Sequence, residues 1–221
     1  MIHTKKIITL FLAVILSMQL LGQDGGWSLV NDENSVQAYV KESPDNPFKI
    51  VRVHTQCKTT FSALISLIKD ADNHHNWIYA NSLSQIKDKR GAFHWVYYGV
   101  SNAPWPVSDR DLVSKIELAQ DTVSGVITIV SRGVPNYLPK KEGLVRVPKL
   151  YSKWTFTPMN NGDIDIEFFL IIDLGGNIPA WLVRDAISNG PFNTLVSLRE
   201  EIQKPIYKEA HLKYITEAIY F

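Results

Sequence analysis

Six strand-like segments follow one another between Ser82 and Asp173, and a single long helical segment comes after them. Turn-forming residues separate these segments, so the connections are short and favour antiparallel pairing. A sheet of this width must cover its apolar face, and the helix expected from Ile178 to about Gln203 is the element long enough to do so. The order predicts an α+β fold, a curved antiparallel sheet around a long C-terminal helix, with strands at residues 82–88, 93–100, 110–118, 126–132, 145–158 and 163–173.

Alternation along these strands predicts which side chains face the helix. In residues 163–173 every even position is apolar, while most odd positions are acidic. Because successive side chains of a strand point to opposite faces, one set must look inward. Both faces of residues 93–100 carry aromatic or apolar groups, which leaves open whether Trp95 with Tyr97 or Val96 with Tyr98 points inward. The other expected inward sets are Ile164, Ile166, Phe168, Leu170 and Ile172; Leu112, Ser114, Ile116 and Leu118; and Ser152, Trp154 and Phe156.

Other elements flank this stretch. Strands are expected at residues 36–40 and 49–55, and the apolar spacing after them predicts a short helix capped by Thr59 or Thr60. In the long C-terminal helix, Gly190-Pro191 predicts a kink or a short break, because proline removes a hydrogen bond and crowds the preceding turn. The tail after Pro205 is compatible with a further helix that ends at Phe221.

The N-terminus has the features of an export signal. Two lysines precede an apolar run that reaches Leu21, which is typical of a secretory signal peptide and is short for a membrane span. We therefore expect an exported protein, periplasmic or extracellular, with an uncleaved N-terminal anchor as the alternative. The expected units are a signal peptide at residues 1–22 and a single domain at residues 23–221, its core at about residues 27–203.

Composition and motif spacing exclude several classes of function. Without the two signal lysines, 21 basic residues face 22 acidic ones, and no basic stripe with interleaved aromatics is present, which argues against nucleic-acid binding. Cys57 is the single cysteine, so no intrachain disulfide exists. The histidines lack metal-ligand spacing, and Ser108 lacks the surroundings of a catalytic serine. We expect no metal, no cofactor and no catalytic residues.

A sheet this wide around one helix is difficult to fill with its own side chains, so the order of elements predicts an internal cavity. The alternative is a dry core filled by the same groups. The candidate ligand-binding residues are Trp95, Tyr97, Arg110, Leu112, Ser114, Trp154, Phe156, Ile166, Phe168, Leu170, Asp185 and Phe192.

Several segments, in this order and spacing, resemble the START family, the steroidogenic acute regulatory protein-related lipid transfer domains. The best match is Pro104 to Val113, which is similar to the family's proline-serine-x-arginine-aspartate segment. The resemblance covers roughly residues 27–203 and implies a helix-grip fold whose hydrophobic tunnel binds one lipid, sterol or other apolar molecule, with no shared catalytic residues. The other matching pieces are Trp27, Asp70, Trp77, residues 131–135, Val145-Arg146, residues 173–183 and Leu198-Arg199.

Two arginines have a structural and a functional interpretation. Arg110 is expected either to pair with Asp111 or a distant acid, or to bind a ligand carboxylate or phosphate in the cavity. Arg146 presents the same choice.

The leading hypothesis is a soluble, monomeric, exported carrier or sensor of an apolar molecule, compatible with transient membrane contact. The alternative is a cyclase or hydratase acting on an aromatic or polyketide-like substrate, for which Asp185, Arg110 and Tyr97 are the titratable candidates. For ligand exchange we expect a gate formed by Gly190-Pro191 and the loop at residues 102–106.

Overall fold

The computed structural model describes residues 25–43 and 46–217. Ten strands form one sheet, in which β8 pairs with β6 and the other nine follow the order β1-β2-β3-β10-β9-β7-β6-β5-β4. Neighbours along this order are antiparallel, as predicted, and only the two-residue pairing of β8 with β6 is parallel. The strands are β1 (Ser28–Glu33), β2 (Val36–Ser43), β3 (Asn46–Cys57), β4 (Asn81–Arg90), β5 (His94–Ser101), β6 (Arg110–Gln120), β7 (Ile127–Gly133), β8 (Val145–Arg146), β9 (Lys149–Pro158) and β10 (Ile164–Asp173).

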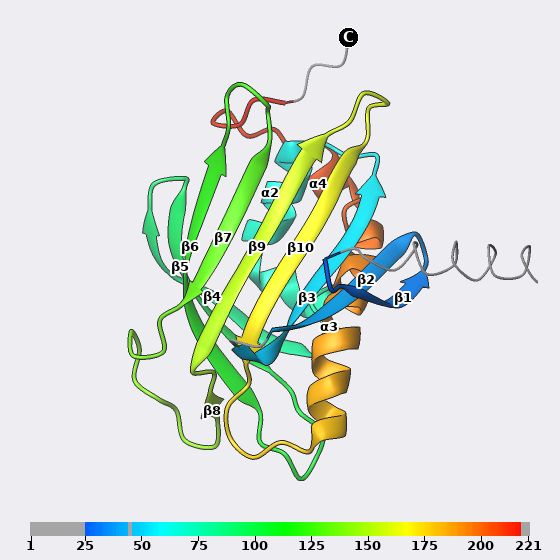
Figure 1. The fold of residues 1–221 in the computed structure, drawn as a ribbon. Helices are drawn as coiled ribbons and strands as arrows, with labels where there is room; N and C mark the ends of the chain where they lie inside the picture. Colours follow the sequence, from blue (N-terminus) through cyan, green and yellow to red (C-terminus); the bar gives the residue numbers. More distant parts are fainter. Residues whose placement is uncertain (1–24, 44–45, 218–221) are drawn as a thin grey trace, which may run out of the picture.

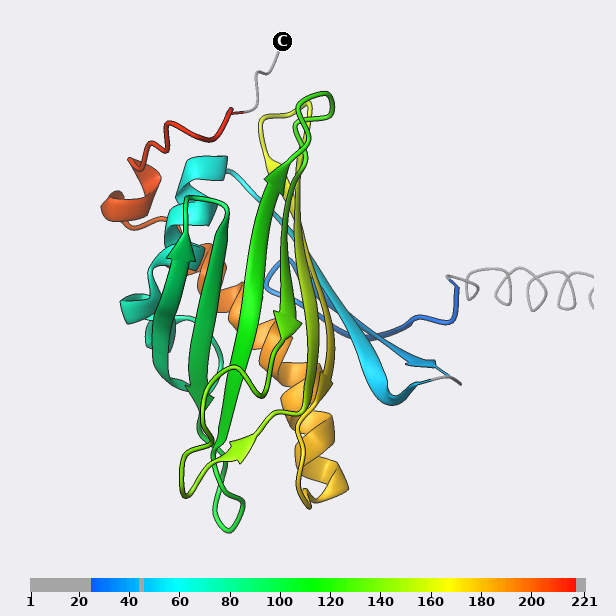
Figure 2. The ribbon, with the colours of Figure 1, turned by 90° about the vertical axis from the view of Figure 1, so that its left-hand side faces the viewer.

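The long helix α3 lies along the inner side of this curved sheet, against β2 and β3 (Figures 1 and 2). The α+β helix-grip arrangement predicted from the order of elements is confirmed. The helical elements are α2 (Phe61–Lys69), a 3-10 helix (Ala71–Asn76), α3 (Ala180–Glu201) and the single turn α4 (Pro205–Lys208).

The helix α2 begins where the sequence indicates. The hydroxyl of Thr60 accepts a hydrogen bond from the backbone N–H of Ala63, so Thr60 is the N-cap. The carboxylate of Glu217 accepts two more, from the N–H groups of Phe61 and Ser62, at 2.8 Å each. The C-terminal tail therefore caps α2, and a helix that continues from Pro205 through the tail is wrong within the described residues. Phe221 and the expected signal peptide lie outside them.

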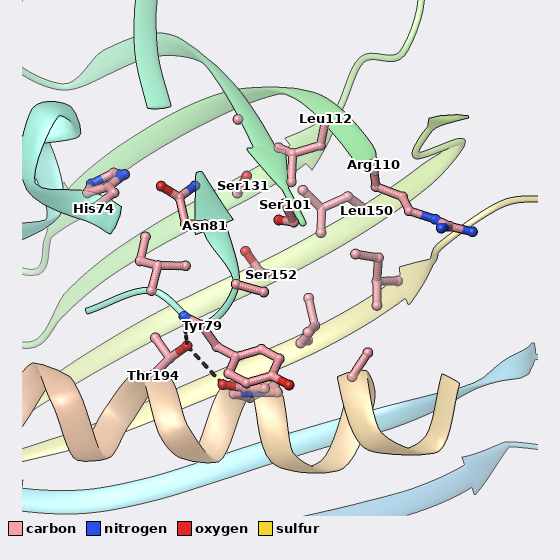
Figure 3. A pocket seen from close by; sticks show the side chains of 18 of the residues that line it. His74, Tyr79, Asn81, Ser101, Arg110, Leu112, Ser131, Leu150, Ser152 and Thr194 are labelled. Atoms are coloured by element: carbon pink, nitrogen blue, oxygen red, sulfur yellow. Dashed lines mark hydrogen bonds between the residues drawn. The ribbon is translucent and has the colours of Figure 1, made fainter. Parts of the chain in front are cut away.

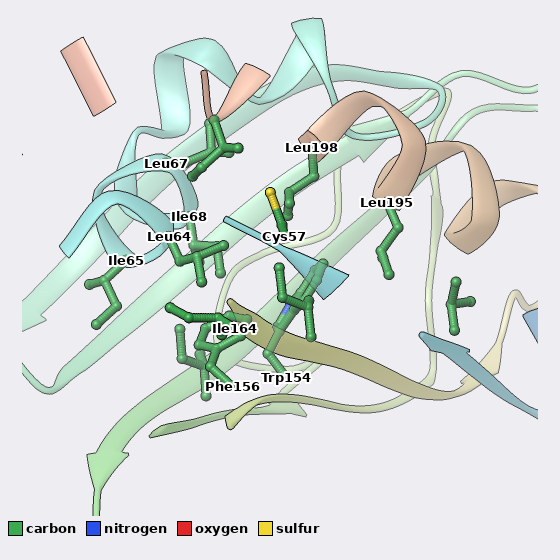
Figure 4. Close-up of a cluster of buried hydrophobic side chains, with 14 of the residues drawn as sticks. Cys57, Leu64, Ile65, Leu67, Ile68, Trp154, Phe156, Ile164, Leu195 and Leu198 are labelled. Carbon is green, nitrogen blue, oxygen red and sulfur yellow. The ribbon is translucent and has the colours of Figure 1, made fainter. Parts of the chain in front are cut away.

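A tightly packed core occupies the α2 end of the molecule (Figure 4). Leu64 and Leu67 of α2 meet Phe156 and Ile164 of the sheet and Leu198 of α3, all five fully buried. Burying this apolar area supplies the main force that holds α2 and α3 on the sheet.

A second, smaller apolar cluster lies on the outer face. Val96, Tyr98 and Val113 are buried there under Val134 and Leu138 of the loop after β7. This packing settles the choice in β5, because Val96 and Tyr98 face outward and Trp95 and Tyr97 face the cavity.

The expected strand at residues 145–158 is wrong, because β8 and β9 are separate elements with different partners. Pro148 lies between them and has no N–H to donate to a ladder, so continuous pairing is not available there. β1 is a further element that the sequence pattern did not indicate.

Of the kink or short break expected at Gly190-Pro191, the break is wrong, because α3 is helical without interruption from Ala180 to Glu201. Pro191 removes one hydrogen bond, but the residue before it is glycine and has no Cβ to clash with the proline ring. The hydroxyl of Thr194 donates to the carbonyl of Gly190 at 2.9 Å, which adds a local link across the same turn.

Candidate ligand-binding cavity

A cavity of about 330 Å³ lies between the inner face of the sheet and α3 (Figure 3). This volume is within the range of small-molecule sites, about 300–1,000 Å³. Its walls come from the inward positions of β5, β6, β7, β9 and β10, from residues 77–81, from the loop at residues 101–104 and from one side of α3. Most of the lining side chains are apolar, as expected of a site for a greasy molecule.

Nine of the twelve residues predicted for ligand binding line this cavity. They are Trp95, Tyr97, Arg110, Leu112, Ser114, Trp154, Phe168, Leu170 and Asp185. The remaining three, Phe156, Ile166 and Phe192, belong to the packed core and are absent from the lining. Alternation identified their inward direction, but it does not reveal how far along a strand the core ends and the cavity begins.

Other lining residues escaped the sequence analysis. His74 lies in the 3-10 helix, Tyr79 in the segment after it and Asn81 at the first position of β4, where no periodic pattern marks a face. Ser131 and Ser152 face each other across β7 and β9 and place small hydroxyls in the middle of the wall. Ser152 was expected to point inward, and this is confirmed.

A chain of polar groups lies at one end of the cavity. His74 bonds the carbonyl of Ile68 through Nε2 at 2.9 Å, and its Nδ1 lies 3.4 Å from the hydroxyl of Tyr97, which in turn bonds Ser84. Burial lowers the pKa of His74, against smaller opposing effects of the Ile68 carbonyl and nearby acids. This end is therefore neutral, and Tyr97 stays protonated because burial raises its pKa.

Tyr79 links the segment before β4 to α3. Its backbone N–H donates to Thr194 Oγ1 at 3.1 Å, and its hydroxyl donates to Asp185 Oδ2 at 3.2 Å. Asn189 donates to the other oxygen of Asp185 at 2.7 Å. A Cβ on Gly190 would come within 3.2 Å of the Tyr79 ring, so glycine lets the ring lie directly on the helix.

Arg146 has a structural role. It forms a two-pronged ion pair with Asp111 at 2.8 Å for each prong and donates to the carbonyls of Pro135, Leu138 and Pro139. These contacts use all five N–H groups of the guanidinium. They fasten the loop after β7 over the outer face, so Arg146 is not available to a ligand.

Arg110, in contrast to Arg146, faces the cavity and has incomplete hydrogen bonding. It is 8% exposed, lines the cavity, and donates to the carbonyls of Ser108 and Gly175. The expected pairing with Asp111 is wrong, because Asp111 points to the other face of β6 and binds Arg146. Figure 3 shows Arg110 at the opposite end of the cavity from His74.

The loop between β5 and β6 borders the cavity on the Arg110 side. Asp109 accepts the N–H of Ala103 at 2.8 Å and closes the loop, and the Trp105–Pro106 peptide is cis. Ala103 and Pro104 line the cavity, whereas the Trp105 side chain is 93% exposed.

The described residues contain no group of three or more histidine, cysteine or acidic side chains arranged to hold a metal ion. No helix in this part of the chain is long and apolar enough to cross a membrane.

The family model for the START domain matches residues 11–206. The chain belongs to the START domain family. The resemblance noted in the sequence is thus confirmed, and membership supports the binding of a lipid or other hydrophobic ligand.

Relatives of this START protein agree with that assignment. It is 30% identical over 178 residues to an uncharacterized protein of Pseudomonas aeruginosa, a match that covers 80% of this chain and 87% of the relative. It is 23% identical to the human phosphatidylcholine transfer protein, with 86% of this chain and 88% of that protein covered. Among solved structures, a STAR-related lipid transfer protein fragment from Xanthomonas axonopodis superposes with a TM-score of 0.74 at 29% identity, covering 81% of this chain and 99% of that one.

Proposed function

We propose that this START protein is a soluble carrier or sensor that encloses one lipid, sterol or other apolar molecule. The observation that carries the proposal is the cavity itself, which is walled by the sheet on one side and by α3 on the other. Removing apolar ligand surface from water would supply the driving force, at about 25 cal/mol per Å². The lipid transfer proteins among its relatives support the same class of ligand.

We further propose that the protein works as a monomer outside the cytoplasm, in the periplasm or beyond the cell. The support is the pair of lysines followed by an apolar run in residues 1–22, which is typical of a secretory signal. In an aqueous compartment an apolar molecule needs a protein that shields it. A carrier with an enclosed cavity meets this need.

Transient contact with a membrane belongs to the same proposal. Trp105 and Trp181 are 93% and 60% exposed and lie at the same end of the molecule, in the loop that borders the cavity and at the start of α3 (Figures 1 and 2). Tryptophan favours the interface between a bilayer and water. Ligand exchange would take place while this end touches the membrane.

The second candidate is an enzyme of the cyclase or hydratase type. Its support is that Tyr97, Arg110 and Asp185 all line the cavity, with neutral His74 next to Tyr97. These groups are dispersed, however, since Asp185 is bonded by Tyr79 and Asn189 and Arg110 lies at the far end. The carrier is the function that the geometry supports better.

Native mass spectrometry of protein purified without detergent tests the carrier. We expect an apolar molecule bound one to one, and its loss in a Leu170→Trp variant that fills the cavity. The matched control is Ile171→Trp on the outer side of the same strand, which should keep the ligand. Protein that binds no apolar molecule, or that converts one chemically, would reject the proposal.

A further inference from the structure

Two buried arginines in the same sheet have opposite surroundings. Arg146, 7% exposed, donates all five of its N–H groups and faces a carboxylate. Arg110, 8% exposed, donates to two carbonyls, one of them at 3.4 Å, and its buried Nε–H has no acceptor. The arginine whose bonding is incomplete is the one that lines the cavity.

This arrangement leaves a buried positive charge without a direct ion pair, since the carboxylate of Asp109 acts on Arg110 only through its nearby charge. Burial lowers the pKa of Arg110, but the guanidinium remains charged at any physiological pH. Burying a charge without a partner is unfavourable, so natural proteins normally pair it. Among the described residues no carboxylate lies within ion-pair distance of Arg110, and the charge of Asp109 raises the Arg110 pKa less than burial lowers it.

The nearby acids are engaged elsewhere. Asp109 accepts the Ala103 N–H and Asp173 accepts the Gly175 N–H, so both hold loops. Asp185, on α3, is bonded by Tyr79 and Asn189. At the opposite end His74 is held neutral by burial. The cavity is therefore positive at the Arg110 end and uncharged at the His74 end, and the carboxylate of Asp185 lies on its α3 side, held by Tyr79 and Asn189.

The strand β6 connects these two ends. Arg110, Leu112, Ser114 and Ile116 point inward one after another, so Ile116 lies roughly 20 Å along the strand from Arg110 at about 3.4 Å per residue. Ser101 lies opposite Arg110 on β5 and adds a hydroxyl to the charged end. The wall beyond is mostly apolar apart from the hydroxyls of Ser114, Ser131 and Ser152, and Trp95 and Trp154 lie near its other limit.

We propose that Arg110 binds the anionic head group, carboxylate or phosphate, of a single-chain amphiphile whose tail lies along β6. A planar guanidinium with free N–H groups matches the two oxygens of such a head group. The cavity volume, near the lower limit for small-molecule sites, favours one chain over two. This inference rests on the proposed carrier function and specifies its ligand class.

Displacement of a neutral fluorescent apolar probe tests the assignment, with palmitic acid, hexadecyl phosphate and hexadecanol as competitors. The three share one chain and differ in the head group. We expect the wild type to bind at least one of the two anions about ten- to a hundredfold more tightly than the alcohol. The ratio between the two anions identifies which head group is preferred.

The variant Arg110→Gln should lose this preference and keep its affinity for hexadecanol. Arg132→Gln, which removes an exposed arginine on the outer face, should behave like the wild type. An unchanged preference in Arg110→Gln overturns the inference and leaves the carrier intact. Failure of the wild type to bind any of the three amphiphiles contradicts the carrier function instead.

A measurement on the wild type alone covers the case in which Arg110→Gln does not fold. Carboxyl-labelled palmitate bound to the protein is followed by carbon NMR while the pH is lowered from about 8 to about 5. A cation beside the carboxylate keeps it ionised throughout this range, whereas an apolar site without a cation raises its pKa into the range. Protonation of the bound acid within the range overturns the inference.

Discussion

Arg110 and Asp111 are neighbours in the chain, yet strand alternation sends them to opposite faces of β6. Arg110 enters the cavity, while Asp111 enters the outer cluster and meets Arg146. Burial raises the pKa of Asp111, but the hydrogen bonds and charge of Arg146 outweigh this effect and hold the pKa below its ordinary value. The pair is therefore ionised in the folded protein and forms the main polar link between the sheet and the loop after β7.

Substitution of Asp111 by asparagine should lower the free energy of unfolding by about 3 kcal/mol, because it leaves the Arg146 charge buried without a counter-ion. Urea denaturation at neutral pH measures the loss. Glu117→Gln is the control, since its ion pairs with His94 and Arg132 are exposed and contribute below about 1 kcal/mol. Equal effects of the two substitutions would contradict the structural role of the buried pair.

The ion pair between Asp111 and Arg146 also makes the stability of the folded protein fall at acid pH. Because the folded pKa of Asp111 is depressed, its contribution is present above the unfolded value, about 3.9, and is lost as the pH falls through the folded pKa. Stability of the wild type should therefore fall more steeply in acid than that of Asp111→Asn. Parallel pH profiles of the two proteins would show that the carboxylate is not stabilised by Arg146.

At the scale of elements, the sequence pattern predicts which face of the sheet a side chain points to. It predicts less well how far the packed core extends along each strand. Ser152, Trp154 and Phe156 of β9 point inward as expected, but the first two line the cavity and the third is in the core. Alternation does not show whether an inward side chain lies in the core or in the cavity, because this depends on where α2 ends and the space under α3 begins. Residues 77–80 were missed for a related reason, since they lie between the 3-10 helix and β4 and Tyr79 is positioned by its contacts with α3.

The continuity of α3 refines the gate hypothesis. The carbonyl of Ile187 has no N–H to accept from residue 191, because that residue is proline, so this turn beside the cavity lacks one backbone hydrogen bond. Gly190→Ala is the poorer test, because its Cβ would press on the Tyr79 ring. Pro191→Ala restores the missing donor without that contact.

Ligand exchange in Pro191→Ala should slow by up to about tenfold if this turn opens during exchange, since one hydrogen bond is worth about 1 kcal/mol. Stopped-flow transfer of a fluorescent fatty acid to vesicles measures the rate. Pro205→Ala makes the same chemical change at the start of α4, outside the cavity, and serves as the control. An exchange rate equal to that of the wild type would reject the gate.

Considered as a whole, the molecule has two different ends. One end carries the C-terminal tail, α2 and the packed core, and the other carries the loop between β5 and β6 and the start of α3 (Figures 1 and 2). Two exposed tryptophans, Trp105 and Trp181, come directly after and before cavity-lining residues at this second end, so the proposed membrane contact has a direction.

Trp105→Ala should weaken binding to phospholipid vesicles by about tenfold, because the variant loses the free energy of moving the indole ring from water into the bilayer interface. Vesicle flotation or sedimentation measures the affinity. Val123→Ala is the control, since Val123 is 96% exposed but lies in the turn between β6 and β7 at the other end. An equal loss of vesicle affinity in both variants would argue against membrane contact through the Trp105 end of the molecule.

The sheet is not a closed barrel, because β1 and β4 are its two edges. The seam between β4 and α3 is held by Tyr79, just before β4, through hydrogen bonds to Thr194 and Asp185 and through its ring, which rests on Gly190. Parting this seam would cost a few contacts and leave every strand pairing intact. The width of ligand that the cavity admits would therefore depend on how easily β4 moves away from α3. The length of ligand is limited by the fixed distance between the ends of the strands.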